Sequence, residues 1–215
     1  MIQNTPFRHF SMSPPGLYDS SRWKGLKVGL LGGSFNPPHK GHYHIASLAM
    51  RRLHLDYVWW LVTPQSPLKT ADNLSPFAKR YELVEKLTQH NPRFIASDLE
   101  EQFQSRYTYE TVQHLKKRFS STQFVWICGM DNAHIFHKWD QWDRLAGALP
   151  IVFIARPPTI GLVKNCPLSM LGPQKRHRYI DDTQPLDAKK PYIYWMLDTK
   201  MVDMSSTYLR SLQGQ

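Results

Sequence analysis

The chain has 215 residues, enough for one domain with its own core. Its only cysteines, Cys128 and Cys166, form no CxxC pair, which argues against a disulfide scaffold or a zinc ribbon. The formal net charge of +10 favours anionic partners such as nucleic acid, a membrane surface or phosphorylated metabolites.

The positive residues are scattered along the sequence, so we expect neither a nucleic-acid nor a membrane partner. No apolar stretch approaches the roughly 20 residues that a bilayer span needs. The N-terminus lacks the continuous apolar core of a secretory signal. We therefore expect a cytoplasmic protein.

Residues 1–24 contain prolines, a glycine and several serines without a periodic apolar pattern, and we interpret them as a mobile N-terminal leader. Residues 25–215 are expected to form a single domain. Within it, residues 157–190 are rich in proline and poor in apolar residues, so we expect an irregular excursion there.

From Leu26 onwards, apolar runs alternate with amphipathic stretches. The apolar runs predict strands at 26–31, 57–62, 93–97, 123–128, 149–155 and 191–197. The amphipathic stretches predict helices at 41–53, 75–87, 108–119 and 205–213. This alternation is typical of an α/β protein with a Rossmann-like open parallel sheet and helices on both faces. In such sheets a ligand binds at the carboxyl ends of the strands.

The loop after the first predicted strand, "GGSFNPPHKGH" at 32–42, has the composition of a phosphate-binding turn. Gly32 and Gly33 lack a Cβ and so allow a ligand to approach the backbone closely. The start of the following helix offers unpaired N–H groups and a partial positive charge. His39 and His42 are three residues apart, so both rings can donate to phosphate oxygens from the same side of that turn.

Other interpretations of this loop remain open. The histidines could ligate a metal, although no cysteine lies near them, and they could be ordinary surface residues. The sequence contains neither a Walker A loop nor a GxGxxG fingerprint, so the two common nucleotide-binding motifs are absent. We expect a nucleotide phosphate site and no dedicated metal site.

The motifs resemble those of the nucleotidylyltransferase superfamily, and in particular those of bacterial nicotinate-mononucleotide adenylyltransferases. "GGSFNPPHKGH" resembles the signature GGSF(D/N)PPHxGH, and further resemblances follow in the same order along the chain. They are "TPQSPLK" (63–69), Phe77 with Arg80, "YTYETV" (107–112), "CGMDNAHIFHKW" (128–139) and "SSTYLR" (205–210). The resemblance covers about residues 26–156 and 191–213.

The resemblance implies adenylyl transfer from ATP to nicotinate mononucleotide, a step of NAD biosynthesis that releases pyrophosphate. It implies that His39, His42 and Arg210 carry the catalytic step. It also implies that ATP is bound by Gly32, Gly33, Ser34, Phe35, His39, His42, Asp131, Ser206, Thr207 and Arg210. The acceptor would be bound by Thr108, Trp139, Lys69 and Arg80.

Mg²⁺ would enter bound to the ATP phosphates and water. One alternative within the superfamily is transfer to nicotinamide mononucleotide, to phosphopantetheine or to another phosphate. A second alternative is a basic nucleic-acid-binding protein that keeps the fold without the activity. The sequence leaves the oligomeric state open.

Overall fold

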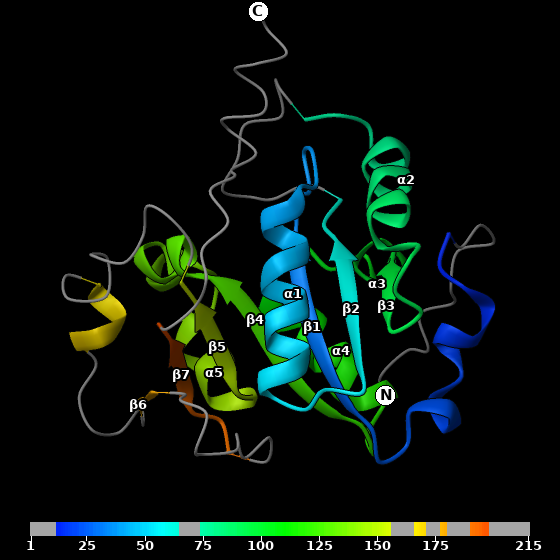
Figure 1. Cartoon of the computed structure of the whole chain (residues 1–215). Coiled ribbons are helices and arrows are strands. Elements are labelled where there is room, and N and C mark those ends of the chain that lie inside the picture. The colour runs from blue at the N-terminus through cyan, green and yellow to red at the C-terminus, as the bar shows by residue number, and fades with distance from the viewer. Residues whose placement is uncertain (1–11, 65–73, 156–165, 171–176, 180–189, 198–215) are drawn as a thin grey trace, which may run out of the picture.

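The structure is a computed structural model, and it describes residues 12–64, 74–155, 166–170, 177–179 and 190–197. Its centre is a parallel sheet in the order β3-β2-β1-β4-β5-β7-β6 (Figure 1). The strands are β1 (Lys27–Gly33), β2 (Tyr57–Val62), β3 (Phe94–Ser97), β4 (Gln123–Gly129), β5 (Ile151–Ile154), β6 (His177–Tyr179) and β7 (Ile193–Met196). The predicted α/β class and open parallel sheet are thereby confirmed.

Five α-helices are present among the described residues. They are α1 (Lys40–Arg52), α2 (Phe77–Thr88), α3 (Leu99–Phe103), α4 (Thr108–Arg118) and α5 (Trp142–Ala148). Short 3-10 helices add η1 (Pro15–Tyr18), η2 (Ser20–Trp23), η4 (Met130–His134), η5 (Phe136–Lys138) and η7 (Pro167–Met170). No helix in the described part of the chain is long and apolar enough to cross a membrane.

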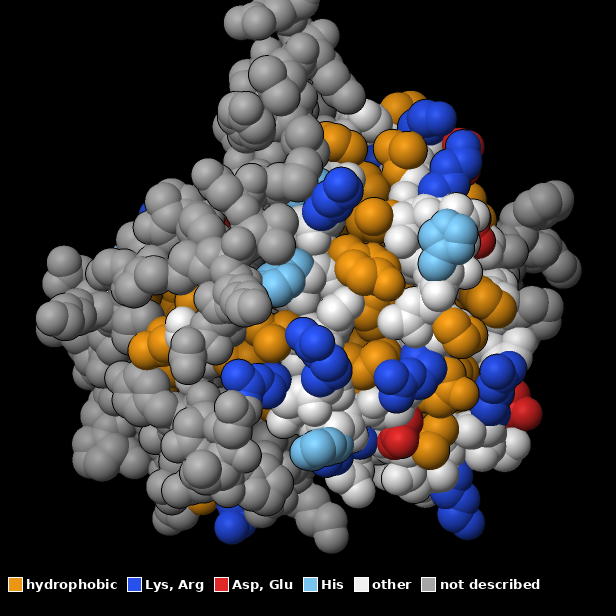
Figure 2. All heavy atoms as spheres, in the orientation of Figure 1, with side chains coloured by type: hydrophobic (Ala, Val, Ile, Leu, Met, Phe, Trp, Pro, Cys, Tyr) orange, Lys and Arg blue, Asp and Glu red, His pale blue; other side chains and the backbone are white. Residues whose placement is uncertain are grey.

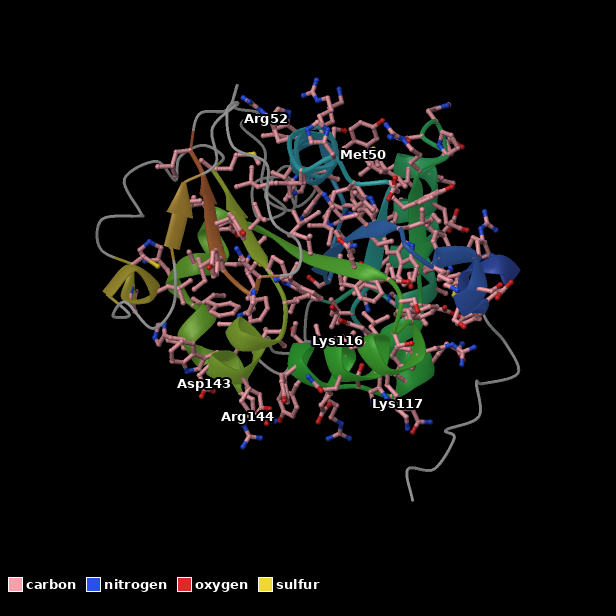
Figure 3. The ribbon with its side chains drawn as sticks, turned by 90° about the horizontal axis from the view of Figure 1, so that it is seen from below. Met50, Arg52, Lys116, Lys117, Asp143 and Arg144 are labelled. Atoms are coloured by element: carbon pink, nitrogen blue, oxygen red, sulfur yellow. The ribbon has the colours of Figure 1, made fainter. Side chains whose placement is uncertain are left out.

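The sheet buries one apolar cluster on each face. Successive strand residues point to opposite faces, so Trp59 joins the cluster under α4 and α5, while Trp60 joins the cluster under α1 and α2. Figure 3 shows α1, marked by Met50 and Arg52, on one side of the sheet, with α4 and α5 on the other. The two buried faces explain why the strands are continuous apolar runs.

The sheet has its switch point at β1. This strand pairs with β2 on one side and with β4 on the other, so the crossover connections diverge there. At such a point the loops after two neighbouring strands separate and leave a crevice beyond their carboxyl ends. The loops after β1 and β4 carry the motifs that the sequence analysis singled out.

Of the leader predicted at residues 1–24, residues 1–11 lie outside the described residues, and residues 12–24 differ from the expected mobile segment. Residues 12–24 pack against the domain through η1 and η2, and Leu17 and Trp23 are buried. The ring of Trp23 lies edge-on to that of Trp59, with centroids 4.9 Å apart, and its Nε1 donates to the carbonyl of Leu17. Turns this short leave no periodic pattern in the sequence, so composition alone suggested a leader.

Three further elements differ from the expected ones. The helix α3 was not expected, because five residues are too few to show helical periodicity. Strand β6 lies within the stretch 157–190 that was expected to be irregular, and it pairs in parallel with β7. Helix α2 begins at Phe77, two residues after its predicted start, and the Ser75 N–H bonds to Oδ1 of Asn36 at 3.2 Å. The predicted helix at 205–213 lies outside the described residues.

Lys and Arg side chains are spread over the α1 face. Figure 2 shows them separated by apolar and uncharged side chains in the part of this face that is coloured. This distribution matches the scatter of positive residues in the sequence. The coloured part of this face therefore forms no continuous basic surface.

Asp98 fixes the N-terminal segment to the end of β3. Its carboxylate accepts hydrogen bonds from Ser13, Tyr18, Gln102 and the N–H of Met12. Burial opposes ionisation of this group, but these bonds outweigh it and lower the pKa of Asp98. The N–H of Asp98 donates in turn to the Ser13 hydroxyl at 2.9 Å. The anion thus orders the segment that precedes the sheet.

Replacing Asp98 with Asn should weaken these bonds and cost about 1–3 kcal/mol of unfolding free energy at pH 7. A lowered pKa in the folded state stabilises the fold above the unfolded pKa and ceases to do so as the pH falls through the folded value. The wild type should therefore lose its advantage over the Asn variant in acid. Urea unfolding at pH 7 and at about pH 3 measures this, with the exposed Asp140→Asn as control. An equal loss for both variants at pH 7 would contradict the role of Asp98.

Candidate active site at the carboxyl ends of β1 and β4

The carboxyl end of β1 is built around two glycines that pack against aromatic rings. A Cβ on Gly32 would lie 2.7 Å from the Trp126 ring, and a Cβ on Gly33 would lie 3.2 Å from the Phe35 ring. The sequence analysis assigned these glycines to close approach of a ligand. Both face the cavity described below, and the space that their side chains would occupy is taken by Trp126 and Phe35.

The start of α1 is capped by two histidines that act on each other. The N–H of Gly41 donates to Nδ1 of His39 at 3.1 Å, and the N–H of His39 donates to Nδ1 of His42 at 3.2 Å. The imidazole centroids are 3.8 Å apart. Because each Nδ1 accepts a bond, the proton of each neutral ring lies on Nε2. The structure therefore brings His39 and His42 together as predicted and fixes their tautomer.

Phe35 connects this helix start to the core. It has a positive φ of 46° and is 2% exposed. Its ring lies 5.4 Å from that of Trp60 and edge-on to that of His42 at 5.1 Å. The sequence analysis expected Phe35 to form a wall of the nucleotide site. In the structure its ring supports His42 from the side of the core.

Arg80 joins the loops after β1 and β2. Its guanidinium group donates to the carbonyls of Ser34, Thr63 and Pro64, each at 2.7 Å, and to that of Ser75 at 2.8 Å. The side chain is 1% exposed, and burial lowers its pKa. Arg80 was expected to contact the acceptor, but it is not among the residues that line the cavity. Its donors are directed to main-chain carbonyls.

A cavity of about 450 Å³ opens beside these loops. Its walls come from the ends of β1 and β4, from the start of α4 and from η5. The lining residues are Gly32, Gly33, Ser34, Thr63, Glu100, Arg106, Tyr107, Thr108, Trp126, Cys128, Asn132, Ile135, Lys138, Trp139 and Asp140. The structure thus places Gly32, Gly33, Ser34, Thr108 and Trp139, which the motifs singled out, around one space.

Trp139 stands at one wall of this cavity, half-buried at the end of η5. Its ring packs against that of Phe136, with centroids 5.2 Å apart. Thr108, the first residue of α4, lines the same cavity, and the capping glutamate Glu110 accepts from the N–H groups of Arg106 and Tyr107. A flat ring beside a helix N-terminus suits an aromatic ligand that carries an anionic group.

Cys128 is the only cysteine among the residues that line the cavity. Burial raises the pKa of its thiol, and the charge of Asp131 raises it further. The thiol therefore stays protonated at neutral pH and is a poor nucleophile. Asp131 itself lies in η4, directly after β4, and is not among the lining residues.

Four predicted site residues, Lys69, Ser206, Thr207 and Arg210, lie outside the described residues. The motifs in turn missed Glu100, a buried carboxyl group in the cavity wall. It precedes the "YTYETV" motif by several residues and belongs to a helix that the periodicity did not reveal. Glu100 stands next to Glu101 in the sequence, and nothing in this pair of acidic residues indicates that one of them is buried.

Comparisons with known proteins agree with this geometry. Residues 30–212 match the model of the cytidylyltransferase-like family. A relative from Bradyrhizobium sp. strain ORS 278, named as a probable nicotinate-nucleotide adenylyltransferase, is 40% identical and is aligned over 88% of this chain and 97% of its own length. A Mesorhizobium japonicum protein of the same name is 46% identical, over 62% of this chain and 68% of its own.

Solved structures share the fold at low sequence identity. The nicotinic acid mononucleotide adenylyltransferase of Plasmodium falciparum complexed with NaAD has a TM-score of 0.64 at 17% identity, with 86% of this chain and 83% of that chain covered. The same enzyme complexed with APC has a TM-score of 0.62 at 16% identity and equal coverage. At such identities the likeness shows the fold alone.

Arg80→Lys tests whether the guanidinium group holds the loops. A lysine ammonium cannot reach four carbonyls that are arranged for a planar fork, so buried acceptors lose their partners. We expect a loss of about 2–4 kcal/mol in unfolding free energy. Urea unfolding measures it, with the exposed neighbour Lys79→Ala as control. Wild-type stability in the lysine variant would contradict this role.

Proposed function

Because this chain belongs to the cytidylyltransferase-like family and, within it, to the nicotinate-nucleotide adenylyltransferases, we propose that it transfers the adenylyl group of ATP to nicotinate mononucleotide. The products would be deamido-NAD and pyrophosphate. One observation supports this most: the cavity lined by Gly33 and Ser34, which lead into the capped start of α1, also holds Trp139 and the start of α4, although His39 and His42 are not among its lining residues. The start of α1 suits phosphates. Trp139 together with the start of α4 suits an aromatic ring that carries an acidic group.

The start of α1 would bind the triphosphate. The positive end of the helix attracts the anion, and the Nε2–H groups of His39 and His42 would donate to phosphate oxygens. Gly33 and Ser34 would lie along the phosphates. Adjacent rings that are fixed through Nδ1 need no reorganisation when charge develops on the reacting phosphate.

The reaction would be an in-line displacement. A phosphate oxygen of the mononucleotide forms a bond to the α-phosphorus of ATP, while the bond from that phosphorus to the bridging oxygen of pyrophosphate breaks with its electron pair. The attacking oxygen is already anionic, so no protein nucleophile or strong base is needed. Catalysis then consists of positioning and charge stabilisation.

At the acceptor end, Trp139 would stack on the pyridine ring, and main-chain N–H groups near Thr108 would bind its carboxylate. The remaining assignments come from the resemblance alone. By these assignments the far side of the triphosphate would be bound by Ser206, Thr207 and Arg210. The adenosine would be bound by Asp131 and the acceptor by Lys69. Arg80 would act by holding the loops rather than by contacting the acceptor.

Mg²⁺ would arrive with ATP as part of the substrate, held by phosphate oxygens and water. It would neutralise charge on the pyrophosphate as that group leaves. We propose small phosphorylated substrates, a cytoplasmic location and no nucleic-acid or membrane partner.

The direct test incubates the chain with ATP, Mg²⁺ and one acceptor at a time, and measures pyrophosphate. The acceptors are nicotinate mononucleotide, nicotinamide mononucleotide and phosphopantetheine. Release with nicotinate mononucleotide and formation of deamido-NAD would support the proposal. A preference for another acceptor would change the substrate and keep the reaction class, and no release with any acceptor would overturn the enzymatic function.

His42→Ala should lower kcat by roughly 10²–10³, the effect of losing a donor to the transition state. The change also removes a cap, so His42→Gln is the matched variant, because glutamine at this position can still accept from the N–H of residue 39. We expect glutamine to restore stability while kcat stays at least about tenfold low.

The exposed His90→Ala serves as the control for loss of an imidazole. Activity of the folded His42→Ala variant within a few-fold of wild type would contradict the assignment. Full recovery of kcat in His42→Gln would show that His42 acts only as a cap of α1.

The choice between the two pyridine mononucleotides should favour the acid by about 10²-fold in kcat/KM. Main-chain N–H donors bind a carboxylate more strongly than an amide, whose NH₂ group would face another donor. Trp139 stacks on either ring, so Trp139→Ala should weaken both substrates and leave their ratio largely intact. Steady-state kinetics at saturating ATP measure both effects. An equal or reversed wild-type preference would point to nicotinamide mononucleotide.

A further inference from the structure

Glu100 is a carboxyl group in the cavity wall that the mechanism above does not use. Its side chain is 5% exposed. The Thr111 hydroxyl lies 3.4 Å from its Oε1, and the Thr63 side chain also hydrogen-bonds to it. The Thr111 hydroxyl lies 2.8 Å from that of Ser105. The carboxyl group is therefore held by hydroxyls and by no cationic partner among these contacts.

This network lies directly behind the acceptor end of the cavity. Thr63 follows β2, Glu100 belongs to α3, and Thr111 is one turn after Thr108 in α4. Ser105 begins the connection whose next residues, Arg106 and Tyr107, line the cavity. Glu100 is thus joined through Thr111 to the helix proposed to bind the ring carboxylate, and it lines the same cavity as the start of that helix.

We infer that Glu100 determines the choice between the acidic and the amide acceptor, because the acidic acceptor binds only when Glu100 is protonated. The inference rests on the proposed function. Two carboxylates cannot both stay ionised in one small cavity without strong repulsion. A neutral Glu100 can coexist with the ring carboxylate, whereas an ionised Glu100 repels it and can accept from the NH₂ group of an amide.

The protonation state of Glu100 can change near neutral pH. Burial raises the pKa of this carboxyl to about 7, and the hydrogen bonds from Thr63 and Thr111 act against that rise. Binding of a second carboxylate would raise the pKa further, so the acidic substrate would bind together with a proton. The preference for the acid should then weaken as the pH rises through about 7.

Other charged or titratable groups surround this end of the cavity and must be separated from Glu100. Asp98 is the N-cap residue of α3, and Glu101 lies on that helix. Tyr107 is the N-cap residue of α4, Glu110 and His114 lie on that helix, and Arg106 precedes it. The other cavity residues of this kind are Cys128, Lys138 and Asp140. Arg106, Lys138 and Asp140 are exposed, so solvent screens their charges. The ratio of the kcat/KM values for two substrates of one enzyme removes the effects that both substrates share.

The decisive measurement is kcat/KM for nicotinate mononucleotide divided by that for nicotinamide mononucleotide, from about pH 6 to about pH 8.5. Both substrates carry the same phosphate, so its titration and that of the triphosphate site cancel in the ratio. We expect the wild-type ratio to fall roughly 10- to 30-fold over this range. A constant ratio overturns the inference without the need for any variant.

Glu100→Gln identifies the group. Glutamine is always neutral and keeps the acceptor towards Thr111, so the ratio should stay within about twofold across the pH range. Glu101→Gln, the neighbouring control, should reproduce the wild-type fall. A pH-dependent ratio that persists in Glu100→Gln assigns the titration elsewhere and overturns the inference. Failure of the proposed function has a different signature, since neither mononucleotide would then yield pyrophosphate at any pH.

Discussion

One buried guanidinium group holds the functional edge of this sheet together. Arg80 reaches from α2 to the carbonyls that follow β1 and β2, where the chain leaves regular pairing and its acceptors lose their partners. Burying a cation is costly unless its donors are satisfied, and here carbonyl oxygens accept from each guanidinium nitrogen. The loop that begins at Ser34, and with it the approach to α1, depends on this contact.

The start of α1 follows from that anchor and from aromatic packing. Phe35 enters the core in a left-handed conformation and supports His42, while Gly32 leaves room for Trp126. The two histidines then cap the helix and each other. The same contacts that end β1 and begin α1 also orient the groups proposed to meet the phosphates, so local stability and phosphate binding use one arrangement.

The acceptor side is supported from the end of β3, the strand next to β2. Asp98 binds the N-terminal segment and precedes α3, which carries Glu100 into the cavity wall. Glu100 is joined through Thr111 to the helix whose first residue is Thr108. An N-terminal segment that lacks any catalytic motif is thereby connected, through a few hydrogen bonds, to the region proposed to distinguish the acceptor.

The sequence by itself determined the order of the longer elements, which are strands β1 to β5, strand β7 and helices α1, α2 and α4, because two buried sheet faces require apolar runs and amphipathic helices that periodicity reveals. Short motifs also led to the prediction of His39, His42, Thr108 and Trp139 as site residues, and Thr108 and Trp139 line one cavity in the structure. Only the tertiary structure decided what isolated side chains contact. Arg80 became an anchor for loops, Trp23 became part of the core and Glu100 became a buried acid through contacts between segments far apart in the chain. Such contacts arise only when the sheet brings those segments together, so no local pattern records them.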